Sequence, residues 1–332
     1  MAADNLKKAF GRRIIEHESL KEHTTMGVGG VADYFIEVKN VDELSTAVEA
    51  AIADEMPYFV KGGGSNIIVS DYGYPGLVIE NRSNNVAFIM DKAQAIVDSG
   101  VFLGQLINAA AAKELGGIEF LVGIPGTIGG AVYGNASCWG GVIGDFVRSV
   151  ALLIPPKDGE EKCKVINVEP KRTEFAYRSS WLKQVVGKSP GRKPVILTVR
   201  MQLAHLRPEE IMRRIRQYQK MRNEKQPIGE FSVGSIFLNP SGEATSQLTE
   251  SQNRELSVGY LLDRAGGKRL RVGKARVSKK HANFIIQSGK ASAEDVKELV
   301  QKMKSLLKEK YGLELQEEVE FLGEWSNGAE IE

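Results

Sequence analysis

Glycine is clustered in this chain, and the clusters constrain the fold more than any other feature of the sequence. The 332 residues include 35 glycines, and the main clusters lie within residues 27–30, 62–64, 123–134 and 140–144. Glycine lets the backbone adopt positive φ angles and approach another group closely. We therefore expect the main chain to pass close to a ligand, or to a second segment, at these places.

The first run with phosphate-binding character is Lys61-Gly62-Gly63-Gly64-Ser65-Asn66, which directly follows an expected strand over 58–61. Successive glycines can point several backbone N–H groups into one concavity, and such a nest suits a phosphate or pyrophosphate. A glycine-rich turn without a ligand explains the same residues equally well. The run is not a Walker A loop, because no Gly-Lys-Ser/Thr follows at the required spacing.

A second run, Gly123 to Asn135, has a backbone that can pass under a pyrophosphate without a side-chain clash. A tight structural crossover is the alternative. Two such runs about 60 residues apart support each other, since a dinucleotide has a pyrophosphate and a ring system to hold. Gly27-Val28-Gly29-Gly30 is not a Rossmann fingerprint, because its third glycine is wrongly spaced and no strand clearly precedes it.

Hydrophobic periodicity predicts mixed helices and strands in the N-terminal half. Residues 34–38 alternate as a strand, and residues 41–53 carry apolar side chains at helical spacing. This order predicts β-α-β units with a ligand loop at the carboxyl end of a strand. The remaining expected elements are a helix over 103–115 and strands over 67–69, 150–154, 165–168 and 194–203.

The C-terminal third reads as a separate domain. A long helix is expected after Leu206, with Pro208 in its first turn, and marks the boundary. A final helix over 292–311 starts with a capping box and carries an apolar stripe. Strands are expected over 281–286 and, from alternating apolar residues, over 313–321.

Composition excludes several classes of protein. Forty-four basic and 42 acidic residues give a net charge of +2, which argues against a broad nucleic-acid surface. Two cysteines and four scattered histidines provide neither a disulfide framework nor metal-ligand spacing. The N-terminus lacks a signal-peptide pattern, and no apolar stretch is long enough to span a bilayer. We therefore expect a cytoplasmic, reduced, metal-free protein without a membrane partner.

Three polar motifs are candidates for chemistry. Arg178, in Tyr177-Arg178-Ser179-Ser180, could hold a carboxylate bidentately, although a surface arginine is the simpler interpretation. Ser235 follows a glycine and precedes an apolar pair, as turn serines do, and no hydrolase motif surrounds it. Glu317 and Glu318 interrupt the last strand and face opposite sides by alternation. Composition and spacing alone indicate a nucleotide-binding α+β protein.

In chain order, these motifs resemble those of the UDP-N-acetylenolpyruvoylglucosamine reductases, the MurB family. The resemblance extends over about 20–323, nearly the whole chain. The matching motifs are His23-Thr24-Thr25-Met26-Gly27-Val28-Gly29-Gly30, Gly62-Gly63-Gly64-Ser65-Asn66, Ile124-Pro125-Gly126-Thr127-Ile128-Gly129-Gly130, Tyr177-Arg178, Gly234-Ser235-Ile236-Phe237-Leu238-Asn239-Pro240, Val277-Ser278-Lys279-Lys280-His281-Ala282-Asn283-Phe284 and Glu318-Val319.

The resemblance implies an α+β fold: a two-lobed FAD-binding domain of the vanillyl-alcohol-oxidase type and a smaller α+β substrate domain. The implied divisions are an N-terminal extension (1–19), FAD-binding lobe 1 (20–86), lobe 2 (87–205), the substrate-binding C-terminal domain (206–323) and a tail (324–332). The short connection after Ser180 resembles the shorter family subtype, which lacks a loop carrying a substrate-contacting tyrosine.

The resemblance also implies the site residues. Arg178, Ser235 and Glu318 match the family's catalytic positions, and Tyr177, Lys225 and Asn239 are the implied substrate contacts. The implied FAD-binding residues belong to the two glycine runs, namely Gly62, Gly63, Gly64, Ser65, Asn66, Pro125, Gly126, Thr127, Gly129 and Gly130. No metal is implied.

The implied reaction is the NADPH-dependent reduction of UDP-N-acetylglucosamine enolpyruvate, in two half-reactions through FAD, for peptidoglycan precursor synthesis in the bacterial cell wall. The implied enzyme acts as a monomer on a small molecule. Gly27, Leu238 and Glu317 depart from residues that are common in the family, and Lys225 is expected to supply the charge absent at Leu238. The alternatives are an oxidase of the same flavoprotein superfamily and a sugar-nucleotide-binding regulator without turnover.

Overall fold

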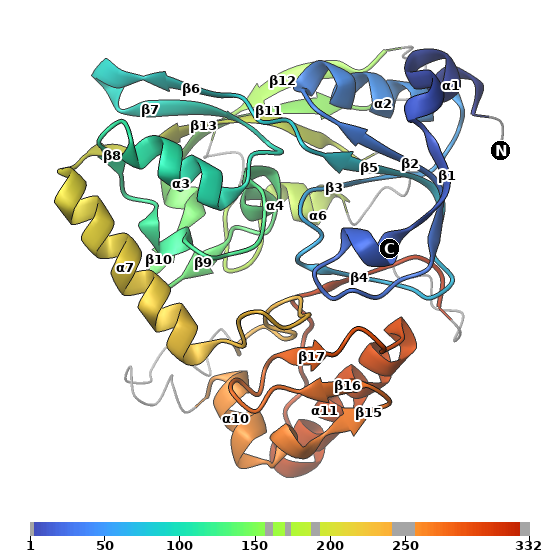
Figure 1. Cartoon of the computed structure of the whole chain (residues 1–332), viewed down its shortest axis with the longest axis vertical. Helices are drawn as coiled ribbons and strands as arrows, with labels where there is room; N and C mark the ends of the chain where they lie inside the picture. Colours follow the sequence, from blue (N-terminus) through green and yellow to red (C-terminus); the bar gives the residue numbers. More distant parts are fainter. Residues whose placement is uncertain (1–2, 157–161, 170–173, 187–192, 241–255, 326–332) are drawn as a thin grey trace.

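The computed structural model describes residues 3–156, 162–169, 174–186, 193–240 and 256–325. Two β-sheets with their helices make up the larger part of the molecule, and a smaller domain of helices and short strands follows in the sequence (Figure 1). The residues of each part bury their own apolar cluster. The fold is therefore of the α+β class that the resemblance implied.

The first sheet has the strand order β1-β2-β5-β3. β2 and β3 both pair in parallel with β5, while β1 pairs antiparallel with β2. The helix between β2 and β3 begins after Asn40, whose side chain accepts the N–H of Glu43, and its apolar face covers the sheet. The elements are α1 (Asp4–Phe10), β1 (Ile15–Ser19), β2 (Val31–Val38), α2 (Val41–Ala53), β3 (Tyr58–Lys61) and β5 (Tyr74–Asn81).

The second sheet is antiparallel, with the order β12-β11-β13-β7-β6. Two helices, one before the second glycine run and one within it, pack on the apolar side of this sheet in one buried cluster. The main elements are β6 (Val86–Ile89), β7 (Gln94–Asp98), α3 (Leu103–Ala111), α4 (Ile128–Tyr133), β11 (Val147–Ile154), β12 (Lys164–Val168), α6 (Trp181–Val186) and β13 (Val195–Gln202). Two short pairs complete it, β8 (Leu115–Gly116) with β14 (Ala204–His205) and β9 (Ser137–Cys138) with β10 (Gly141–Val142).

Helix α7 (Pro208–Lys225) leads from the second sheet to the smaller domain (Figure 1). It begins with Pro208, which fixes φ and needs no N–H partner at a helix start. In the smaller domain, the apolar stripe of α11 packs on α10 and on a three-stranded sheet. Its elements are α10 (Val258–Arg264), β15 (Arg271–Val272), β16 (Ala275–Val277), β17 (Ile285–Gln287) and α11 (Ala293–Tyr311).

The end of the chain returns to the larger part of the molecule. β18 (Glu320–Leu322) pairs in parallel with β4 (Ile67–Val69), the strand that follows the first glycine run. The pairing places Glu318, just before β18, next to that run. This one strand pair therefore connects the expected cofactor loop with an expected catalytic residue.

Most of the expected elements are confirmed, including α2, β3 and β4 with the predicted bounds, and α11 with its Ser292 capping box. Three expectations were wrong in extent. The helix predicted over 103–115 ends at Ala111, because residues 115–116 pair as β8 with β14. The strands predicted over 281–286 and 313–321 are replaced by the shorter β17 and β18, because residues 281–284 form a turn and residues 316–318 make only an isolated bridge with residues 236–238.

The two ends of the chain are partly packed. Leu6 of α1 is fully buried under the first sheet, and Trp325 is buried in the core of the smaller domain. Residues 326–332 of the expected tail lie outside the described residues. Among the helices that the structure describes, none combines the length and apolar character needed to cross a membrane.

Candidate active site

The two glycine runs lie against each other. A Cβ on Gly62 would collide with the Thr127 hydroxyl, and one on Gly126 would lie 3.3 Å from the Ser65 Oγ. A Cβ on Gly63 would lie 3.2 Å from the ring of Phe102 and 3.7 Å from the Cα of Gly126. Only residues without side chains permit this approach, so the fold explains why both segments need glycine.

The first glycine run is held against the segment His23-Thr24-Thr25. Gly64 has φ +62°, and its carbonyl accepts the N–H of Thr25 at 3.0 Å. A Cβ at this position would collide with the carbonyl of His23. The loop is therefore held in a left-handed turn that few residues other than glycine adopt.

A buried cluster of charged residues lies next to the first glycine run. This cluster was not predicted from the sequence. Lys61 and Glu80 are both almost fully buried and form an ion pair. Glu80 also contacts His23 Nδ1, at 2.9 Å, and Arg82 Nε, at 2.6 Å. Burial alone would raise the pKa of Glu80, but Lys61, Arg82 and His23 outweigh it, so the pKa lies below its ordinary value.

The second run turns into α4. Thr127 is the N-cap of this helix, and its hydroxyl accepts the N–H of Gly130 at 3.5 Å. Gly129 packs directly on Ser99, whose carbonyl accepts the Gly129 N–H at 2.8 Å. The Pro125 carbonyl faces Gly63. Of the cofactor residues expected in the second run, Pro125, Gly126 and Thr127 thus lie against the first run, whereas Gly129 packs on Ser99.

The expected catalytic residues come together in one pocket. The residues that line it are Tyr177, Arg178, Ser235, Phe237, Asn239, Ser257, Gly259, His281, Asn283 and Glu318. They come from the turn before α6, from the segment after α7, from α10, from the turn before β17 and from the chain end. Sequence spacing could not show this convergence, because it depends on the return of the chain to β4.

Ser235 belongs to an extended segment clamped between two others. The N–H of Ile236 donates to the carbonyl of Asn283 at 2.9 Å, and the N–H of Glu318 donates to the carbonyl of Ile236 at 2.8 Å. The buried Asn283 amide also makes both of its hydrogen bonds with the Phe237 backbone, at 2.8 and 3.1 Å. Asn283 therefore fixes the segment that presents Ser235, a function not foreseen from the sequence.

Glu318 is attached to the first glycine run through its backbone. The Asn66 amide donates to the Glu318 carbonyl at 3.1 Å, and the Asn66 carbonyl accepts the N–H of Glu320 at 3.0 Å. Burial raises the pKa of the Glu318 carboxyl above its ordinary value, although Arg178 and Lys183 pull it down. The neighbouring Glu317 instead pairs with Lys304 of α11, so the two glutamates face opposite sides as predicted.

Arg178 lies at a tight turn with φ +53°. Its Nε is 3.1 Å from Oε1 of Glu318, an ion-pair distance. The Nε–H is buried and does not point along a hydrogen bond to any partner in the described part of the chain. The Nε–H of Arg178 therefore lies close to a carboxyl without a well-directed hydrogen bond among the described residues.

The expected substrate contacts divide into two groups. Tyr177 and Asn239 line the pocket, and Asn239 Oδ1 accepts the N–H of Val258 at the start of α10. Lys225 is not part of the lining; its ammonium lies 5.2 Å from the ring centre of Trp139. His281 lines the pocket and accepts the N–H of Asn283, and burial lowers its pKa.

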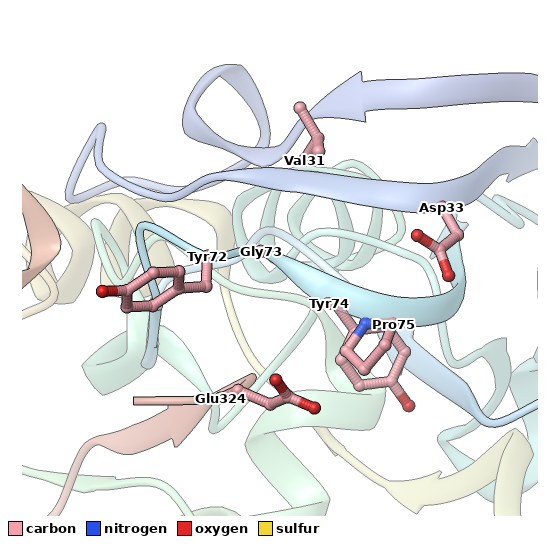
Figure 2. Close-up of a pocket in the computed structure, with 7 residues that line it drawn as sticks. All are labelled: Val31, Asp33, Tyr72, Gly73, Tyr74, Pro75 and Glu324. Carbon is pink, nitrogen blue, oxygen red and sulfur yellow. The ribbon is translucent and has the colours of Figure 1, made fainter. Parts of the chain in front are cut away.

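Gly27, one of the departures from the family pattern, has a structural reason. Its φ is +66°, and a Cβ there would lie 2.7 Å from the ring of Phe231. A larger residue at this position therefore requires movement of Phe231. A second hollow, formed by Val31, Asp33, Tyr72, Gly73, Tyr74, Pro75 and Glu324, contains none of the expected site residues (Figure 2).

Comparisons with known proteins match both parts of the chain. A family model described as "FAD binding domain" matches residues 32–161, and one described as "UDP-N-acetylenolpyruvoylglucosamine reductase, C-terminal domain" matches residues 226–322. Relatives named UDP-N-acetylenolpyruvoylglucosamine reductase include a protein from Syntrophomonas wolfei, which is 35% identical over 94% of this chain and 96% of the relative's length. Another, from Thermotoga maritima, is 34% identical over 94% of this chain and 98% of its own.

A solved structure has the same architecture. The crystal structure of UDP-N-acetylenolpyruvylglucosamine reductase from Thermus caldophilus aligns with a TM-score of 0.71 and 32% identity, covering 93% of this chain and 98% of that one. The fold and the pocket thus define a flavin-dependent oxidoreductase with an FAD-binding domain and a separate C-terminal domain. The chain belongs to the UDP-N-acetylenolpyruvoylglucosamine reductase family.

Proposed function

We propose that this chain reduces UDP-N-acetylglucosamine enolpyruvate to UDP-N-acetylmuramate with NADPH as the electron donor, in peptidoglycan precursor synthesis. The observation that carries the proposal is the convergence of Arg178, Ser235 and Glu318 in one pocket beside the first glycine run. The pocket combines a cation, a hydroxyl and a carboxyl, which are the groups that a reduction of an enol ether next to a carboxylate requires.

The two glycine runs fit an FAD pyrophosphate. The Gly62–Gly64 loop and the start of α4 form a cradle that an added Cβ at Gly62 or Gly64 would disrupt, and backbone N–H groups of such loops bind phosphate. Residues 62–66 with Pro125, Gly126, Thr127, Gly129 and Gly130 would hold the cofactor. When bound, FAD supplies two-electron chemistry that accepts a hydride from NADPH and passes it to the substrate.

Arg178 is suited to the charge that develops in this reaction. Hydride addition to the vinyl CH2 carbon of the substrate places negative charge on the side of its carboxylate. A preorganised guanidinium stabilises developing charge most strongly where water is excluded. The buried, incompletely paired Nε–H of Arg178 supports this assignment.

Ser235 is the proposed proton donor to the second carbon. A serine hydroxyl is a weak acid in water, so the donation requires a strongly basic carbon next to it. Glu318 is proposed to assist in its protonated form, which its raised pKa favours. These assignments are supported by the shared pocket and by the match to the family's motifs.

The finer expectations are part of the same proposal. Tyr177 and Asn239 are proposed substrate contacts from inside the pocket, and Lys225 is proposed to bind a substrate phosphate from its margin. Residues 20–86 and 87–205 are proposed as the FAD-binding lobes and 206–323 as the substrate domain. The enzyme is proposed to be a cytoplasmic monomer, which sedimentation of the FAD-loaded chain would test.

An anaerobic spectral titration tests the function. The flavin spectrum of the purified chain should bleach when NADPH is added and return when UDP-N-acetylglucosamine enolpyruvate is added. Recovery with oxygen alone, and none with this substrate, would instead favour the oxidase alternative. A colourless chain that cannot be loaded with FAD would contradict an enzyme of this kind and favour a binding protein.

A further inference from the structure

Asn135 is the last residue of the second glycine run and is not among the expected site residues, yet its side chain reaches the turn that carries Arg178. It lies two residues after α4, is 4% exposed and has φ +45°. Its amide Nδ2 donates to the carbonyl of Ala176 at 2.7 Å, across 41 positions in the sequence. Its Oδ1 accepts the N–H of Gly144 at 3.1 Å. Both ends of the buried amide are therefore satisfied.

The Arg178 turn is small, and its own backbone closes it. Ala176 and Ser179 exchange two backbone hydrogen bonds, at 3.0 and 3.1 Å, and these enclose Tyr177 and Arg178. The next residue, Ser180, is fully buried, and its hydroxyl donates to the carbonyl of Tyr133 at 2.7 Å. The two sides of the turn are thus tied to Tyr133, the last residue of α4, and to Asn135, two positions further on.

The backbone of Arg178 makes these ties necessary. A non-glycine residue with φ +53° is strained and keeps that conformation only when its surroundings hold it. The carbonyl of Ala176 accepts from both Ser179 and Asn135, so loss of the second donor loosens one side of the strained turn. The position of the guanidinium relative to Glu318 depends on that turn.

We propose that Asn135 is a positioning residue that holds the Arg178 turn against the end of α4. The inference rests on the proposed function, in which Arg178 stabilises charge in the substrate half-reaction. It also gives the second glycine run a connection to the chemistry, since the short helix capped by Thr127 ends at Tyr133, two residues before Asn135. Asn135 touches neither substrate nor cofactor in this account; it acts through Arg178.

The substitution Asn135→Asp tests the proposal at one atom. Aspartate tolerates positive φ nearly as well as asparagine and still accepts the Gly144 N–H, but an ionised carboxylate cannot donate to Ala176. In the FAD-loaded chain, reoxidation by saturating substrate should slow by about ten- to a hundredfold, the scale of a misplaced catalytic group. Flavin reduction by NADPH and the FAD dissociation constant should stay unchanged. Asn167→Asp, on an exposed position of β12, is the matched control.

A double variant separates positioning from a merely structural role. If Asn135 acts through Arg178, Asn135→Asp should slow reoxidation no further in an Arg178→Ala background. Equal slowing in both backgrounds, or normal reoxidation accompanied only by a lower melting temperature, would overturn the proposal. Ser180→Ala, which removes the other tie, should give the same pattern and serves if Asn135→Asp fails to fold. Failure of the wild-type chain to be reoxidised by substrate would overturn the proposed function itself, and this inference with it.

Discussion

The substitution Gly64→Ala addresses the feature on which the cofactor site depends most. Gly64 closes the first glycine run with φ +62°, and its carbonyl accepts the N–H of Thr25. An added methyl group would meet the backbone carbonyl of His23 and lie 3.0 Å from the Cα of Thr24. Because these are backbone atoms, they cannot rotate away as a flexible side chain could. The loop itself must therefore move.

The expected cost has two parts. A left-handed conformation costs an alanine about 1–2 kcal/mol. Displacing the loop weakens the bond from Thr25 to Gly64, with a net contribution of about 0.5–1.5 kcal/mol. Together these two contributions should lower the free energy of unfolding by roughly 1.5–3.5 kcal/mol. FAD binding would require the displaced loop to return to its original position, which costs at least the second of these two energies. The affinity for FAD should therefore fall by about tenfold.

Gly312→Ala is the matched control for this prediction. Gly312 ends α11 in the same left-handed region, at φ +65°, but a Cβ there meets nothing within 4 Å. It should cost only about 1–2 kcal/mol and leave FAD binding unchanged. Chemical denaturation of the apoprotein gives the stabilities, and quenching of flavin fluorescence gives the dissociation constants. Equal effects of the two substitutions on both quantities would refute the reasoning about loop contact.

Three further outcomes are expected. Ser235→Ala should leave flavin reduction by NADPH nearly intact but slow reoxidation by substrate by roughly 10²–10⁴-fold; stopped-flow traces in which both half-reactions stay fast would show that the proton-donor assignment is wrong. The pKa of Glu318 in the folded chain lies above its ordinary value of 4.5, so the unfolded chain loses this proton at a lower pH than the folded chain. The contribution of the protonated Glu318 to the free energy of unfolding is therefore lost as pH rises from 4.5 through the folded pKa. Glu318→Gln should remove this slope from urea unfolding curves of the apoprotein, and an unchanged slope would argue against the raised pKa. Ser292→Ala should lower the free energy of unfolding by about 1 kcal/mol through loss of the α11 cap without changing either half-reaction, and unaltered unfolding would contradict the capping assignment.

Local features of the fold could be predicted from the sequence because their causes lie within a few residues. The bounds of α11 follow from the reciprocal bonds between Ser292 and Asp295 and from the apolar stripe behind them. The short strands could not be predicted in this way. Residues 281–286 and 313–321 have strand-like composition, but most of their backbone groups bond to turns and to single bridges rather than to a ladder.

In the candidate site, too, local features could be predicted from the sequence and long-range contacts could not. The individual motifs around Arg178, Ser235 and Glu318 could be found by resemblance, since each is a short run of residues. Their supports could not be found, because they depend on contacts between distant segments. The amide of Asn66 reaches the Glu318 carbonyl across 252 positions, and the bond from Asn135 to Ala176 spans 41. Only the folded chain brings these groups together.

The most direct test of the central claim is to follow the atoms transferred to the substrate. The FAD-loaded chain, reduced anaerobically with unlabelled NADPH, is mixed with UDP-N-acetylglucosamine enolpyruvate in deuterated water, and the product is analysed by mass spectrometry and NMR. Because the N–H of reduced flavin and the hydroxyl of Ser235 both exchange with solvent, the account predicts UDP-N-acetylmuramate with one deuterium on each of the two former vinyl carbons. An unreduced substrate recovered from a fully bleached enzyme would contradict it.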